Sequence, residues 1–111
     1  MLINSINYVL KSHDAILTDC YADTGYIGYL VGENTRLIGC SYFNNYTYEM
    51  DDVTVIDHRE GALLVNNCQF RKDSPHAVLY KGDSSKVIWR DNILAGKYEF
   101  NESEKQNLDI N

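Results

Sequence analysis

The chain repeats the stretch Leu63-Leu-Val-Asn-Asn-Cys-Gln-Phe70 three more times without a gap. The matching segments are Ala15-Ile-Leu-Thr-Asp-Cys-Tyr-Ala22, Thr35-Arg-Leu-Ile-Gly-Cys-Ser-Tyr42 and Val87-Ile-Trp-Arg-Asp-Asn-Ile-Leu94. A motif that recurs along a chain usually marks structural units that stack, because each unit alone cannot bury its apolar face. The repeat therefore predicts an architecture of stacked units, and it says little about biochemical function.

Four positions of this repeat keep their character in every copy. The third position is apolar, the fifth holds a tight-turn residue, the sixth is small and the eighth is again apolar. In order of position, the residues are Leu17, Leu37, Val65 and Trp89; Asp19, Gly39, Asn67 and Asp91; Cys20, Cys40, Cys68 and Asn92; and Ala22, Tyr42, Phe70 and Leu94. Stacking in columns would explain the small sixth position. We expect the Asn or Asp beside the turn to hydrogen-bond to the turn of the neighbouring unit.

The pattern of residues along the chain predicts one all-β domain over residues 1–100. From Ala15 to Phe100 the sequence is rich in Val, Ile, Tyr, Leu and Thr, with breaks at Gly, Asn and Asp. Apolar residues at helical spacing predict a short amphipathic helix within residues 1–11, namely Leu2, Ile3, Ile6, Val9 and Leu10. Residues 101–111 are polar, so we expect a frayed C-terminal tail there.

The sixth positions lie 20, 28 and 24 residues apart, which is within the range of solenoid coils. The stretch His76-Ala-Val-Leu-Tyr-Lys-Gly-Asp-Ser-Ser-Lys-Val-Ile-Trp-Arg-Asp-Asn-Ile93 resembles the strand, turn, strand and Asn-turn coil of pectin-lyase-like proteins and phage tailspikes. The resemblance covers residues 12–95. It implies a short right-handed parallel β-helix of about four coils, whose open end the N-terminal helix would cap.

A second all-β architecture fits the same breaks if they are hairpin turns. Residues 26–39 would fold around Glu33-Asn34, residues 54–65 around residues 59–61, and residues 78–89 around Gly82-Asp83. The result would be an antiparallel β-meander that closes as a sandwich or a small barrel. The gap-free alignment of the repeat copies favours the parallel β-helix.

Composition places the chain among folded proteins of a reducing compartment. Of its 111 residues 44% are hydrophobic and one is proline, which argues against disorder. No apolar run is long enough to span a membrane, and the start lacks the features of a secretory signal. Three cysteines cannot all pair with one another. We therefore expect reduced, buried thiols and a cytoplasmic protein of a bacterial host, which a phage could also encode.

The sequence carries no strong catalytic motif. It has no glycine-rich phosphate loop, no His-Glu-x-x-His and no paired Cys-x-x-Cys spacing. The cysteines could form a metal or nucleophile set with His13, His58 and His76, for instance Cys40 with His58, but they occupy an apolar position of the repeat. We therefore predict no catalytic residue, no metal site, no cofactor and no enzymatic activity.

Charge is distributed unevenly along the chain. The net charge of −6 lies in residues 1–58, which hold eight acids and two bases, whereas residues 59–111 hold eight of each. Seven of the nine tyrosines also lie in the first half. An acidic surface repels nucleic acid and attracts basic proteins, and tyrosine is enriched at interfaces. We expect a basic protein partner and no direct contact with nucleic acid or membrane. The alternative is a soluble acidic protein whose tyrosines line strands.

The longest interval between repeat copies, from Cys40 to Cys68, marks a candidate binding loop. Its excess of four to eight residues falls within residues 43–52. Insertions of this kind become loops on one face of a repeat protein, often the binding face. The loop and the strand after it hold the predicted partner-binding residues, Tyr46, Tyr48, Glu49, Met50, Asp51, Asp52 and Asp57. The aromatic rings and the thioether would supply contact area, and the carboxylates would attract a basic partner. The alternative is that Tyr46 and Tyr48 point inward from a strand and that the acids only keep an edge of the sheet soluble.

These features fit a non-catalytic inhibitor that neutralises a basic partner protein by occlusion, as toxin-immunity and phage anti-defence proteins do. The alternative is a carbohydrate-binding or structural β-helix module of a phage tailspike or adhesin, which we would expect to form a homo-oligomer, namely a trimer. A small enzyme ranks last. The dependence of binding affinity on salt concentration discriminates the first two functions. Salt weakens binding to a basic protein steeply, whereas it hardly affects the stacking of sugars on tyrosine.

Overall fold

The computed structural model describes residues 6–9, 14–23, 26–43 and 53–110. In these residues twelve short strands form three sheets of four strands each. Sheet A consists of β1 (Ile6–Val9), β4 (Ile27–Val31), β7 (Thr54–His58) and β10 (Val78–Lys81). Sheet B consists of β2 (Ile16–Thr18), β5 (Thr35–Ile38), β8 (Leu63–Asn66) and β11 (Val87–Arg90). Sheet C consists of β3 (Tyr21–Asp23), β6 (Ser41–Phe43), β9 (Gln69–Arg71) and β12 (Ile93–Ala95).

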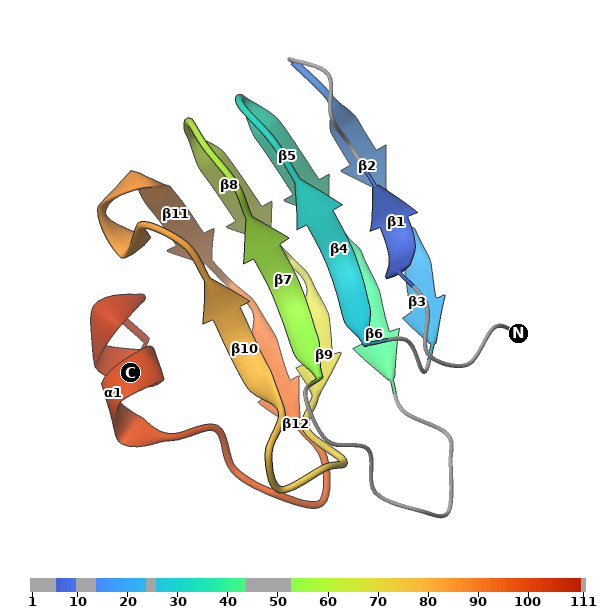
Figure 1. Ribbon diagram of the computed structural model, residues 1–111, viewed down its shortest axis with the longest axis vertical. Helices are drawn as coiled ribbons and strands as arrows, with labels where there is room; N and C mark the ends of the chain where they lie inside the picture. Colours follow the sequence, from blue (N-terminus) through green and yellow to red (C-terminus); the bar gives the residue numbers. More distant parts are fainter. Residues whose placement is uncertain (1–5, 10–13, 24–25, 44–52, 111) are drawn as a thin grey trace.

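The described chain passes through sheets A, B and C in that order four times, and each passage is one circuit. Strands of successive circuits pair in parallel, as the arrows lying side by side in Figure 1 show. The repeat copies are in register, because Leu17 lies opposite Leu37, Leu37 opposite Val65 and Val65 opposite Trp89. The prediction of a predominantly β fold made of stacked, parallel units is therefore confirmed.

The antiparallel alternative is wrong. A hairpin would pair residues 27–31 with residues 35–38, but these strands belong to sheets A and B and pair with strands of other circuits. The break between them bends the chain into the next sheet, because Asn34 adopts the left-handed conformation with a φ of 54°. In the corresponding turns of the neighbouring circuits, Asp14 has a φ of 58° and Gly61 a φ of 73°.

A second column of left-handed residues turns the chain from sheet B into sheet C. The φ angles are 55°, 66°, 54° and 54° at the fifth positions of the repeat, Asp19, Gly39, Asn67 and Asp91. The tight turn expected at this position is therefore present in every circuit. Gly39 is constrained twice, because it has a positive φ and because a Cβ there would collide with the carboxylate of Asp19.

The side chains at the third and eighth positions of the repeat belong to the hydrophobic core or pack against it. Leu37, Val65, Phe70 and Tyr42 are all buried. The ring of Phe70 lies 5.7 Å from that of Trp89, so the column from sheet C packs against the column from sheet B. Full burial of one side chain of this size contributes about 1.5–3 kcal/mol to stability. The third and eighth repeat positions thus contribute to the cohesion between the sheets, together with the buried side chains of sheet A such as Tyr29, Val55 and Leu79.

The prediction of an N-terminal helix within residues 1–11 is wrong for the described residues 6–9. They form strand β1, which pairs in parallel with β4 so that Ile6 lies opposite Ile27 and Val9 opposite Leu30. Helical spacing is a weak signal, and main-chain pairing with a neighbouring strand overrides it. The remainder of the predicted helix lies outside the described residues.

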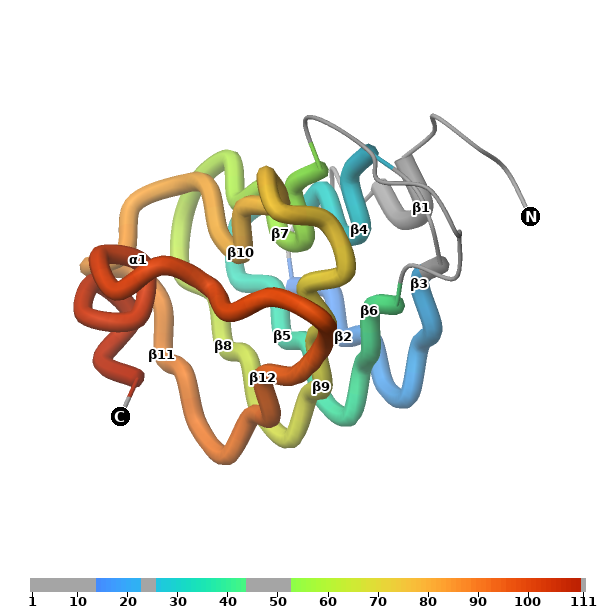
Figure 2. Tube along the Cα trace, turned by 90° about the horizontal axis from the view of Figure 1, so that it is seen from below, coloured from blue at the N-terminus to red at the C-terminus, as the bar shows by residue number. Residues whose placement is uncertain are grey.

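The C-terminal segment contains helix α1 (Glu102–Asn107), where the sequence suggests a polar tail. Asn101 begins the helix by accepting a hydrogen bond from the N–H of Glu104 at 2.9 Å. Phe100 and Leu108 are buried on either side of α1, which lies at the end of the stack beside β10 and β11 (Figures 1 and 2). A short 3₁₀ helix, η1 (Ser84–Lys86), connects β10 to β11.

Candidate partner-binding site

The sequence predicts seven partner-binding residues, of which the structure describes one, Asp57. Six of them lie outside the described residues, namely Tyr46, Tyr48, Glu49, Met50, Asp51 and Asp52. Asp57 lies in β7 and its side chain is only 6% exposed. Arg59, which is 62% exposed, donates a hydrogen bond from Nη2 to Oδ2 of Asp57 at 3.1 Å. This ion pair compensates the negative charge of the buried Asp57 carboxylate, and the Arg59 side chain stays at the surface.

A cluster of carboxylates lies where the chain turns from sheet A into sheet B. Each circuit contributes one residue to this acidic edge, which consists of Asp14, Glu33, Glu60 and Asp83. Three of these side chains are exposed and that of Glu33 is half-buried. Parallel pairing places adjacent circuits about 4.8 Å apart. The four acids do not share one register position, because the pairing places Asp14 opposite Asn34 and Glu33 opposite Gly61. The edge is therefore a cluster of carboxylates from successive circuits and not an evenly spaced row.

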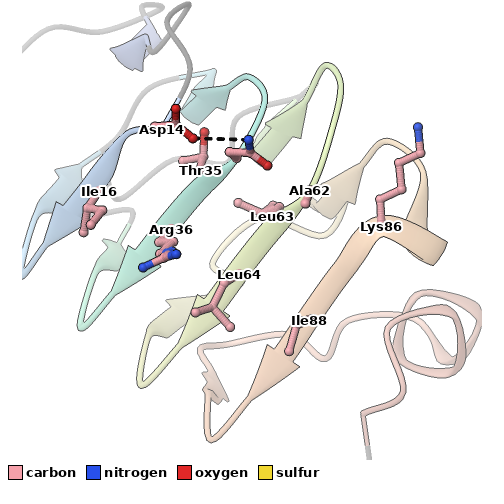
Figure 3. A pocket seen from close by; sticks show the side chains of 10 residues that line it. Asp14, Ile16, Thr35, Arg36, Ala62, Leu63, Leu64, Lys86 and Ile88 are labelled. Carbon is pink, nitrogen blue, oxygen red and sulfur yellow. Dashed lines mark hydrogen bonds between the residues drawn. The ribbon is translucent and has the colours of Figure 1, made fainter.

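Hydrogen bonds orient the two ends of the acidic edge. Asn34 donates from Nδ2 to Oδ1 of Asp14 at 3.2 Å, which Figure 3 shows as a dashed line. At the other end, Oδ1 of Asp83 accepts hydrogen bonds from Ser85, at 2.6 Å from Oγ and at 3.0 Å from the main-chain N–H. The bond from the Ser85 hydroxyl, followed by the bond from its N–H, lowers the pKa of the Asp83 carboxyl. Asp83 therefore stays ionised further into the acid range than an ordinary aspartate.

A buried histidine lies beneath the acidic edge. His58 is 4% exposed, with Nδ1 2.6 Å from the hydroxyl of Tyr80 and Nε2 3.0 Å from the main-chain oxygen of Glu60. Because a carbonyl oxygen only accepts hydrogen bonds, Nε2 carries the proton of that contact. The Tyr80 hydroxyl lies 3.0 Å from the main-chain oxygen of Asp83, and burial, followed by the charge of Asp83, raises the pKa of Tyr80 to about 12. This network connects the turns that carry Glu60 and Asp83.

The outer face of sheet B carries a shallow depression of about 610 Å³ (Figure 3). Across its floor runs an outer row that takes one side chain from each strand, Ile16, Arg36, Leu64 and Ile88. Ile16 is 57% and Ile88 51% exposed, although both are large and apolar. Lys86 lies at the rim next to the acidic edge. The depression thus combines exposed aliphatic side chains with two cations, Arg36 and Lys86, and with the carboxylate of Asp14 at its edge.

The cysteines form a column at the corner between sheets B and C. Cys40 and Cys68 are buried, Cys20 is half-buried, and all three are free thiols. Cys40 donates to the main-chain oxygen of Leu17 at 3.3 Å, so this thiol is bound to the main chain and not to His58. Contact with Cys40, followed by burial, raises the pKa of Cys68. Within the described residues no three His, Cys, Asp or Glu side chains are grouped so as to hold a metal ion.

Sequence reasoning missed the acidic edge and the outer row of sheet B. A signal for the edge exists, because each break between the first two strands of a circuit contains one acid, as in Glu33-Asn34, Glu60-Gly61 and Gly82-Asp83. The outer row follows from the second position of the repeat, which holds Ile16, Arg36, Leu64 and Ile88. Alternation along a strand sends this position outward whenever the third position is buried.

None of the described helices is long and apolar enough to cross a membrane. Compared with family models, with curated proteins and with solved structures, the chain matches none of them.

Proposed function

We propose that this chain is a non-catalytic acidic binding protein that neutralises a basic partner protein by occlusion. The acidic edge carries the proposal, because it offers one carboxylate per circuit in a cluster held by parallel pairing. A cluster of carboxylates of this kind suits the cationic groove or active site of a basic enzyme. The net charge of −6 would also speed the encounter with a basic protein.

Occlusion requires a preorganised surface and no reacting group. The titratable side chains next to the edge support this interpretation, since His58 is hydrogen-bonded to Tyr80 and Asp57 is paired with Arg59. A rigid surface loses little conformational entropy on binding. In this proposal the protein acts in the cytoplasm of a bacterium, as an immunity or anti-defence protein that blocks a basic enzyme.

The loop of residues 43–52 belongs to the same proposal as a further contact. Tyr46, Tyr48 and Met50 would supply contact area, and Asp51 and Asp52 would add charge. The double substitution Asp51→Lys with Asp52→Lys should then weaken partner capture without changing the free energy of unfolding. Unchanged capture by this double variant would remove the loop from the proposal.

The architecture also supports a finer fold proposal and a second function. We infer a short right-handed parallel β-helix, because four circuits pass through three parallel sheets and parallel crossovers are right-handed in nearly all proteins. That architecture favours a carbohydrate-binding or structural module of a tailspike or adhesin as the alternative function. Such a module would form a trimer, which sedimentation would detect.

The proposal is tested by capturing partners from a bacterial lysate with the immobilised protein at low and high salt. We expect a basic protein to be retained at low salt and released at high salt, because exposed charges are screened within about 8–10 Å at physiological ionic strength. The test variant combines Glu60→Lys with Asp83→Asn, which keeps the carbonyl that accepts from Ser85. The matched control combines Glu99→Lys with Glu102→Gln and changes the net charge equally at exposed sites away from the edge.

Loss of the basic protein with the edge variant but not with the control would support the acidic edge. Equal capture by the two variants would show that net charge alone attracts the partner, which would overturn the edge as the binding site. A blank capture together with a trimeric mass would favour the glycan-binding or structural module.

A further inference from the structure

The outer row of sheet B is an exposed apolar row with a cation within it. Parallel register places Ile16 beside Arg36, Arg36 beside Leu64 and Leu64 beside Ile88. With a strand spacing of about 4.8 Å, the row extends for about 14 Å across the sheet. Single exposed apolar residues are ordinary, whereas apolar side chains that gather on one face mark an interaction surface. Here Ile16 and Ile88 are exposed and Leu64 is half-buried between Arg36 and Ile88.

The cations of this face are not held in salt bridges by described residues, although Asp14 also lines the depression. The charge of Lys86 contributes, after the hydrogen bonds from Ser85, to the lowered pKa of Asp83. Arg36 lies in the row, Lys86 at its rim and Arg90 in the neighbouring outer row, where it lies opposite Asn66. None of the three forms a salt bridge with another described residue, in contrast to Arg59 and Arg71, which pair with Asp57 and Asp73. A cationic surface on a chain with a net charge of −6 requires a specific explanation.

We propose that the outer face of sheet B is a docking surface for an acidic amphipathic segment of a protein. Apolar side chains of the segment would cover Ile16, Leu64 and Ile88, and a carboxylate would pair with the guanidinium of Arg36. Arginine suits this position because its planar donors bind a carboxylate in a bidentate manner. Lys86 would receive a second carboxylate at the rim.

The chemistry of the face disfavours other ligands. Nucleic acid is disfavoured because three cations could neutralise few phosphates. A sugar ring would lack a stacking platform, since the residues that line the depression include no aromatic side chain. A second copy of the protein is disfavoured as well. Two copies packed through this face would bring Arg36 and Lys86 near their equivalents in the other copy, and like charges repel each other.

This docking surface goes beyond the proposed function, because it binds charge of the opposite sign at a different place. The acidic edge can therefore fail its test while the outer face of sheet B passes, and the reverse also holds. The experiment on this face uses a defined probe and does not require the partner of the edge.

The probe is a synthetic peptide that alternates leucine with glutamate, and the matched peptides carry glutamine or lysine instead. Binding is followed by the methyl resonances of Ile16, Leu64 and Ile88 in a labelled sample of the full chain. The methyl groups of Val78, which is 40% exposed on sheet A, are the internal reference. We expect the glutamate peptide to shift the three methyl signals and the lysine peptide to leave them unchanged.

The variant Arg36→Gln with Lys86→Gln should weaken binding of the glutamate peptide by about tenfold or more, which corresponds to about 1.4 kcal/mol. Lys81→Gln with Lys97→Gln removes the same charge from exposed positions outside the depression and should leave the affinity unchanged. Equal shifts with the lysine peptide, or equal losses in both variants, would overturn the proposal. Shifts with anionic vesicles of phosphatidylserine and phosphatidylcholine but not with the peptide would also overturn it in favour of a lipid surface.

Discussion

Sγ of Cys68 donates a hydrogen bond to the main-chain oxygen of Leu37, which lies 3.3 Å away in the preceding circuit. The same bond recurs elsewhere in the column, at 3.3 Å from Cys40 to Leu17 and at 3.0 Å from Nδ2 of Asn92 to Val65. The sixth position of the repeat thus binds the carbonyl of the third position one circuit earlier. Asn92 adds a second bond, because its Oδ1 accepts from the N–H of Cys68 at 2.8 Å.

Replacement of Cys68 by asparagine should therefore preserve the fold. In Cys68→Asn the amide would donate to Leu37 and could accept from the N–H of Cys40, as Asn92 does one circuit later. We expect the free energy of unfolding to stay within about 1 kcal/mol of the parent protein, because a net hydrogen bond is worth about that much. Cys68→Ala should lower it by about 1–2 kcal/mol, since it removes the donor and leaves Leu37 without this partner. Urea denaturation measures the free energy of unfolding of both variants. An asparagine variant no more stable than the alanine variant would contradict the role of the sixth position as a hydrogen-bond donor to the preceding circuit.

The left-handed turn between sheets B and C predicts that a substitution of Gly39 destabilises the fold. Gly39→Ala should lower the free energy of unfolding by about 1–2 kcal/mol, because alanine resists a positive φ and its methyl would meet Asp19. Asn67→Gly, in the same column, should change it by less than about 0.5 kcal/mol, because glycine adopts this conformation readily. Thermal unfolding followed by circular dichroism compares the two. Equal stability of Gly39→Ala and the parent would show that the turn has another conformation.

Helix α1 protects the edge of sheet A through one side chain. Oε1 of Glu104 accepts a hydrogen bond from the N–H of Leu79 in β10 at 2.8 Å. Glu104→Ala should accelerate hydrogen exchange at the Leu79 amide by about tenfold, since the loss of one hydrogen bond is worth about 1 kcal/mol or slightly more. Glu104→Gln keeps an acceptor oxygen and should exchange at nearly the parental rate. Unchanged protection in the alanine variant would indicate that α1 does not cover this strand.

Stability at alkaline pH should depend on Tyr80. Its pKa is raised to about 12 by burial and by the charge of Asp83, whereas an unfolded tyrosine has a pKa of about 10. The fold favours the neutral phenol, so the contribution is complete below about pH 10 and is lost as the pH rises towards 12. Tyr80→Phe should flatten the decline of the urea midpoint between these pH values. Tyr98→Phe serves as the control, and a decline equally reduced by both variants would contradict the assignment to Tyr80.

Particular residues show how far the sequence alone leads. The repeat columns from Leu17 to Trp89 and from Ala22 to Leu94 correctly indicate the buried side of sheets B and C, because alternation and burial are local properties of a strand. The signal for α1 was also present, since Asn101 followed three residues later by Glu104 is a typical helix start. The prediction of a frayed tail rests only on the polar composition of residues 101–111.

The sequence by itself determined the repeat unit, its inward positions and the left-handed residues that end its second strand, because these depend on local conformation and on the pattern of apolar side chains. Only the tertiary structure decided that Ile6–Val9 is a strand, that Asp57 is buried against Arg59, and that acids from separate circuits meet along one edge. These features depend on which main-chain groups pair between circuits of unequal length. The repeat encodes the register of sheets B and C, but the position of sheet A and of the turns beside it depends on parallel pairing between residues far apart in the chain, which the repeat does not cover.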